Sequence, residues 1–107
     1  MTNVYKESVE NPVHVKNLTV GTTAVKVNPQ GMQFVKGILI RAPGSLDPTP
    51  NGSPCWFGPA TVTADAHADT GGFPLLPGDS LFIPSEYLEN LYAISDQASQ
   101  NLAWMGV

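Results

Sequence analysis

The sequence is poor in charged residues and has almost no cysteine. Both shortages limit the classes of protein to which it can belong. Only 13% of its 107 residues are charged, well below the usual quarter for a soluble domain. Cys55 is the only cysteine, so no disulfide can form within the chain. A chain of this length can bury a core without such cross-links, and we expect a single domain.

Clusters of basic residues are also missing. The five lysines and arginines are scattered through the first 41 residues, and the net charge is −4. Nucleic acids and anionic membrane surfaces attract clustered Lys and Arg, so we expect neither as a partner. No run approaches the roughly 20 apolar residues of a membrane helix, and nothing resembles a signal peptide. We therefore expect a protein made in the cytosol.

Short strand-like segments, separated by glycine and proline, make up most of the chain. We predict a polar N-terminal arm over 1–12 and a β-sandwich domain over 13–107, either a sandwich or a small jelly-roll-like barrel. One short helical turn is expected near 85–91, with Ser85 as its cap and Leu88 and Leu91 on one side. The predicted strands cover 13–20, 22–27, 32–42, 55–64, 80–83, 91–95 and 101–107.

Glycine and proline also predict local features between and within these strands. Gly37, inside the strand predicted over 32–42, suggests a bulge or a bend. The segment "PGSLDPTPNGSP", residues 43–54, is expected to be an exposed loop. The triplet "PGD" at 77–79 predicts a tight turn that leads into the strand over 80–83.

Two short motifs resemble those of enzymes but lack the partner residues. "PGDSLFIP" is similar to the turn and strand of a cupin, which binds its metal through a His-x-His pair and a later histidine. This chain has only His14 and His67, in no such pair and with no histidine after Pro84. "DTG" at 69–71 matches the triplet of an aspartic protease, but it follows the polar segment "TADAHA" and too little chain remains for that fold.

Two further sets of residues carry chemistry of their own. Asp65, His67 and Asp69 project to one side of an extended chain and could hold a divalent metal ion, although acidic residues in such a loop are usually only solvated. Cys55 would need a base to form a reactive thiolate, and a lone cysteine at the start of a strand is usually a small buried hydrophobe. We expect no catalytic residue and no cofactor. Whether Asp65, His67 and Asp69 bind a metal ion is left undecided by the sequence.

The C-terminal third shows a more extended resemblance. Residues 72–107, "GFPLLPGDSLFIPSEYLENLYAISDQASQNLAWMGV", resemble the endings of small virion proteins of tailed bacteriophages. Those endings share the turn and strand "GFPL-x-PG-x-S-x-x-x-P", then a leucine-bearing helical turn, "LY-x-I" and a final strand. "VKNLTVGTTAVKV" and "FVKGILIRAP" in the first half are similar in style.

This resemblance implies a non-enzymatic structural role as a capsid cement or decoration protein. Such proteins bind the outside of the capsid, often as trimers, and bridge neighbouring major capsid proteins, so the expected location is the virion surface. Another virion module of the tail, head fibre or adaptor, and a carbohydrate- or receptor-binding β-sandwich, are the alternatives. Trp56, Phe57 and Trp104 are of types that lie more often in a core than at an interface. Because aromatic residues are also enriched at interface centres, Tyr5, Trp56 and Phe57 are the candidate interface residues.

Overall fold

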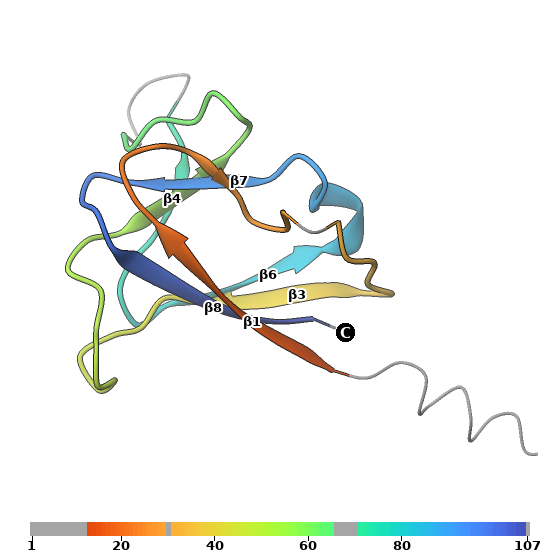
Figure 1. Cartoon of the computed structure of the whole chain (residues 1–107), viewed down its shortest axis with the longest axis horizontal. Helices are drawn as coiled ribbons and strands as arrows, with labels where there is room; N and C mark the ends of the chain where they lie inside the picture. Colours follow the sequence, from red (N-terminus) through yellow and green to blue (C-terminus); the bar gives the residue numbers. More distant parts are fainter. Residues whose placement is uncertain (1–12, 30, 66–70, 107) are drawn as a thin grey trace, which may run out of the picture.

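A computed structural model of the chain describes residues 13–29, 31–65 and 71–106 (Figure 1). The arm predicted over 1–12 lies outside the described residues. The predicted all-β class is confirmed, because two four-stranded antiparallel sheets pack as a sandwich. The strands are β1 (His14–Val20), β2 (Val25–Lys26), β3 (Gly37–Arg41), β4 (Cys55–Gly58), β5 (Phe73–Leu75), β6 (Ser80–Pro84), β7 (Tyr92–Ser95) and β8 (Gln100–Gly106).

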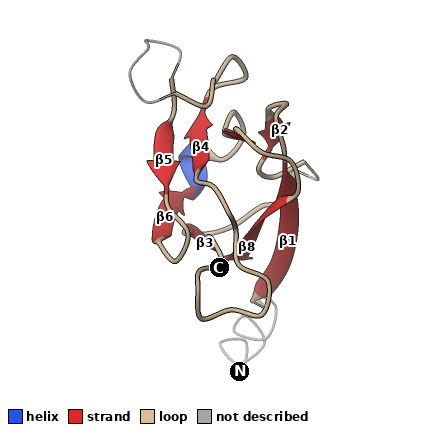
Figure 2. Ribbon diagram, turned by 90° about the vertical axis from the view of Figure 1, so that its left-hand side faces the viewer, coloured by secondary structure: helices blue, strands red, loops and turns tan. Residues whose placement is uncertain are grey.

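The strand order shows how the chain is wound. One sheet has the order β1-β8-β3-β6 and the other β2-β7-β4-β5. First pairs with last, second with seventh, third with sixth and fourth with fifth, as if one long hairpin were rolled up into two layers. This is the arrangement of a jelly roll, and Figure 2 shows its two layers of strands in red.

The core lies between the two sheets and comes from alternate strand positions. Ile38, Ile40, Leu102 and Trp104 point inward from the first sheet. The second sheet contributes Cys55, Phe57, Leu75 and Ala93. Phe34, in the segment between β2 and β3, packs edge-to-face on Trp104 with ring centroids 5.4 Å apart. Alternation at a period of two is what gives each strand one buried side.

The predicted helical turn is present but shorter than expected. A 3-10 turn, η1 (Ser85–Tyr87), follows β6, and Leu88 behind it is buried in the core. Leu91 packs against the same cluster, so the two leucines lie on one side, as predicted, and that side faces the core. The prediction that Ser85 caps the turn is wrong, because Ser85 is its first residue and the residue before it is Pro84.

Several predicted strand boundaries were also wrong. β3 begins only at Gly37, because residues 32–36 belong to the connection between β2 and β3. Hydrogen bonds of Asn28 stabilise the start of this connection. The side chain of Asn28 donates to the Met32 carbonyl at 2.9 Å and accepts from its backbone N–H at 3.2 Å. β4 ends at Gly58 because Pro59 starts a turn, closed by the Val62 N–H donating to its carbonyl. β5 is a strand in a segment where none was predicted.

The expectation of an exposed loop over 43–54 is also wrong in part. Gln100 accepts hydrogen bonds through Oε1 from the backbone N–H groups of Gly52 and Ser53, at 2.8 and 3.1 Å. The Asn51 side chain exchanges two hydrogen bonds with the backbone of Asn101. Asn51 and Ser53 are therefore buried. Long-range side-chain bonds hold this loop on the sandwich, and no local pattern predicts them.

Candidate interaction surface

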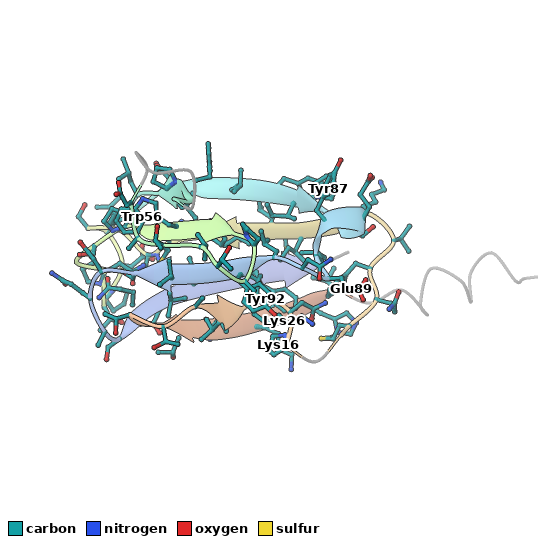
Figure 3. The ribbon with its side chains drawn as sticks, turned by 90° about the horizontal axis from the view of Figure 1, so that it is seen from above. Lys16, Lys26, Trp56, Tyr87, Glu89 and Tyr92 are labelled. Atoms are coloured by element: carbon teal, nitrogen blue, oxygen red, sulfur yellow. The ribbon has the colours of Figure 1, made fainter. Side chains whose placement is uncertain are left out.

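The three predicted interface residues have different outcomes. Phe57 is only 4% exposed and belongs to the core, which is the alternative that the sequence left open for it. Trp56, the residue before it on β4, lies on the opposite side of the sheet and is half-buried (Figure 3). Alternation along β4 gives neighbouring aromatics opposite environments, and nothing local tells which of them faces inward. Tyr5 lies outside the described residues.

Trp56 sits in an apolar setting on the outer side of its sheet. Its register partners are Pro74 on β5 and Ile94 on β7. The indole Nε1 is buried and has no hydrogen-bond partner among the described residues. A binding site for a polar ligand needs a few placed polar groups beside the aromatic surface, and these strand neighbours provide none. The surroundings of Trp56 therefore do not support carbohydrate recognition.

The thiol of Cys55 is enclosed in the core. Its strand partners are Leu75 and Ser95, and the residue is fully buried. Burial raises the pKa of the Cys55 thiol from its ordinary 9.0 to about 11, because the thiolate would lose its hydration. At neutral pH the group is a protonated, inaccessible hydrophobe, as the sequence suggested.

We expect this pKa to appear as a pH dependence of stability. The folded chain holds the thiol proton more tightly than the unfolded chain, so the stabilisation is complete below pH 9 and is lost as the pH rises toward about 11. Denaturant unfolding of the wild type and Cys55→Ala from pH 7 to pH 11 measures the effect. The wild type should lose stability above pH 9 more steeply than the variant, and parallel curves would contradict the buried thiol.

The two motifs that resemble those of enzymes form a tight turn and an isolated bridge where they are described. Residues 76–79 form a tight turn in which the Asp79 N–H donates to the Leu76 carbonyl at 2.9 Å and Gly78 has φ of +94°. The turn predicted from "PGD" is thereby confirmed. Gly71 forms an isolated bridge with Thr63, whereas Asp69 and Thr70 lie outside the described residues. So does His67, and the proposed metal trio keeps only Asp65 within them.

An unpredicted feature is a row of exposed apolar side chains on the outer face of the β1-β8-β3-β6 sheet. Val15 lies opposite Met105, Met105 opposite Leu39, and Leu39 opposite Phe82. Their exposed fractions are 67% for Val15, 41% for Met105, 42% for Leu39 and 48% for Phe82. One apolar residue from each strand thus forms a continuous line across the sheet, which we call the apolar row.

The apolar row divides the face into two halves of different character. On one side are Asn17, Ala103, Arg41 and Ser80, which are aligned as the next outward row in the register. Arg41 there forms a 3.0 Å ion pair with Asp47. On the other side, toward the start of β1, are exposed Val13 and the pair Gly37 and Pro84. The face is therefore polar beyond the row, while Val13 extends its exposed apolar part toward the start of β1.

The sequence contains a signal for this row, although it is weak. A sheet with one solvated face gives alternating apolar and polar residues, whereas a sheet with two apolar faces gives unbroken apolar runs. The segments "GILI", "LFI" and "AWM" are such runs within β3, β6 and β8. They show that both sides of these strands are apolar, but only the register shows that the outward residues form one line.

The edge strands of the two sheets are protected against pairing with an additional strand. β2 has two residues and β5 three, with Pro74 in the middle of β5, and β6 ends at Pro84. β1, the longest edge strand, places Lys16 on its core side opposite Trp104, with the lysine exposed. In Figure 3, Lys16 and Lys26 lie at the same border of the molecule. Short strands, proline and inward lysine are the usual protections of an edge.

A cavity of about 500 Å³ opens at one end of the sandwich, beside η1. Its lining combines apolar residues, including Met32, Phe34 and Leu88, with the charged residues Lys26, Glu86 and Glu89.

No three His, Cys, Asp or Glu among the described residues are grouped so that they could hold a metal ion. In the described part of the chain, no helix is long and apolar enough to cross a membrane.

Neither a family model, nor a curated protein, nor a solved structure matches this chain. The most distinctive part of the described surface is the apolar row.

Proposed function

We propose that this chain is a non-enzymatic virion protein of a tailed bacteriophage. In this proposal it binds the outside of the capsid through the apolar row and strengthens contacts between major capsid proteins. Residues 72–107 resemble the endings of small virion proteins of tailed bacteriophages. This resemblance suggests that the chain is part of the virion and that it forms a trimer. The observation that carries it is the line Val15, Met105, Leu39 and Phe82 on an otherwise weakly charged surface.

Physical chemistry favours protein docking at this face. Isolated exposed apolar residues are ordinary, but a contiguous exposed group marks an interaction surface. Phe82 and Met105 belong to types enriched at the centres of protein interfaces. Low surface charge lowers the desolvation cost of close packing. Many copies on a capsid lattice would add avidity, so each contact can be weak.

Capsid binding is the test of this proposal. The purified protein is mixed with assembled capsids of the phage that encodes it, or with unassembled capsid subunits, and binding is measured by sedimentation. We expect binding to capsids and not to free subunits. Phe82→Asp should weaken it by about 30-fold or more, the effect of losing about 2 kcal/mol at an interface hot spot. Leu46→Asp is the matched control, because Leu46 is 96% exposed and lies in the loop after β3, outside the row.

Two outcomes would contradict the proposal. Equal capsid binding by the Phe82→Asp and Leu46→Asp variants would remove the apolar row from the interface. If particles with and without the protein release their DNA at the same temperature, the protein does not strengthen the capsid. Circular dichroism of each variant establishes that it is folded, which we expect because both side chains are exposed.

A further inference from the structure

The cavity beside η1 lies between two connections that link the sheets, and hydrogen bonds join these connections to each other. One is the segment between β2 and β3, and the other is η1 with the residues before β7; Figure 1 shows both at the same end of the sandwich. The Ser85 N–H donates to the Lys36 carbonyl at 2.9 Å, and the Val27 N–H donates to the Leu91 carbonyl at 3.0 Å. The space is therefore preformed, and about 500 Å³ lies within the usual volumes of small-molecule sites.

The apolar part of the lining is the edge of the core. Leu88 belongs to the core, and Met32 and Phe34 pack against it. The Phe34 ring is held by edge-to-face contacts with His14 and Trp104, at centroid separations of 6.0 and 5.4 Å. An apolar group placed in the cavity would therefore meet a fixed apolar surface and would be stabilised by removal from water.

Charged groups of both signs line the same cavity. Lys26 comes from β2 and is half-buried, whereas Glu86 and Glu89 come from η1 and the residues after it and are exposed. Figure 3 labels Lys26 and Glu89. Among the described residues, none of the three takes part in an ion pair, so the lysine ammonium lies more than 4.0 Å from both carboxylates. A ligand that carries one charge of each sign could contact both.

We propose that this cavity binds a small zwitterion with an apolar side chain, of the class of amino acids and short peptides. The ligand carboxylate contacts Lys26, and its ammonium group contacts Glu86 and Glu89. Its apolar side chain packs against Met32 and Phe34. A purely anionic ligand would meet two carboxylates, and a neutral one would leave the charges that it covers without a partner, so both bind less well. This inference goes beyond the proposed function and does not depend on it.

Methionine methyl NMR of the full chain tests the inference with an internal control. Met32 lines the cavity, whereas Met105 lies on the outer face of the first sheet. Titration with L-phenylalanine should shift the Met32 resonance and leave that of Met105 in place. The ligand is small and the glutamates are exposed, so we expect a Kd on the order of 1 mM. Alanyl-phenylalanine, whose charges are further apart, shows whether an amino acid or a peptide binds better. If neither compound shifts Met32, or if Met105 shifts as much, the inference is wrong.

Two blocked analogues separate recognition of charge from apolar binding. N-acetylphenylalanine lacks the ammonium group and phenylalanine amide lacks the carboxylate, while both keep the aromatic ring. Each should bind about tenfold more weakly than phenylalanine, because one charge-assisted contact is lost. An analogue that binds as tightly as the amino acid would overturn the inference, since the cavity would then not recognise a zwitterion.

Variants matched in charge assign the contacts to single residues. Lys26→Met should weaken phenylalanine binding about tenfold, whereas Lys16→Met removes the same charge at the same border of the molecule but outside the cavity lining and should not (Figure 3). Glu89→Gln and Asp96→Asn make the same comparison for the acidic groups, because Asp96 is exposed and does not line the cavity. An unshifted Met105 resonance shows that each variant is folded. Equal binding by both members of a pair would contradict the inference. No capsid is used, so these results stay interpretable if the proposed function fails.

Discussion

Trp104→Ala should lower the free energy of unfolding by about 3–5 kcal/mol, the cost of deleting a large aromatic side chain from a packed core. Trp104 is 4% exposed and sits between Lys16 and Ile40 in the register of the first sheet. It also makes the edge-to-face contact with Phe34, a geometry that adds to the burial of area.

The adjacent residue provides the comparison. Met105→Ala, one position further along β8, should change the free energy of unfolding by less than about 1 kcal/mol, since its side chain lies on the outer face. Urea unfolding followed by fluorescence for the wild type and Met105→Ala, and by circular dichroism for all three proteins, gives both values. Similar losses for the two variants would mean that the two faces of β8 have been assigned wrongly.

The outward placement of Met105 shows where sequence reasoning stopped. Composition and punctuation predicted the all-β class and most strand regions, because β-branched and aromatic runs between glycine and proline have few other solutions. They could not show which residues of "AWM" or "LFI" face outward, since those runs lack alternation. The apolar row depends on three strand registers, each set by pairing between residues far apart in the chain.

Residue type could not decide between core and interface for Phe57, for a related reason. Aromatic residues are enriched both in cores and at interface centres, so type alone does not separate the two roles. On β4, alternation places Phe57 in the core and Trp56 outside. The residues that do form an exposed line include Val15, Leu39 and Met105, which are ordinary core types. Exposure, and not residue type, distinguishes them.

Gly37 is another position at which the sequence pointed to a special backbone feature but did not identify which one. A bulge or bend was predicted there, but the register between β3 and β6 is continuous from Gly37 opposite Pro84 to Arg41 opposite Ser80. Gly37 instead adopts φ of +149°, a conformation that side chains rarely allow. A Cβ atom at this position would collide with the carbonyl oxygen of Ile83 and lie 2.9 Å from the Cα of Pro84. The glycine is needed for the close approach of the β6 backbone.

We therefore expect Gly37→Ala to cost about 3 kcal/mol or more, because backbone strain and overpacking act together. Gly31→Ala separates these two causes. Gly31 also has a positive φ, +65°, yet nothing lies within 4 Å of its Cβ position, so strain alone should cost about 1 kcal/mol. Thermal and urea unfolding of both variants would measure the difference. Equal losses would mean that β6 moves away from the new methyl group at little cost. In that case Phe82 and Pro84 would shift with it, and the apolar row would be adaptable at the edge where Phe82 lies.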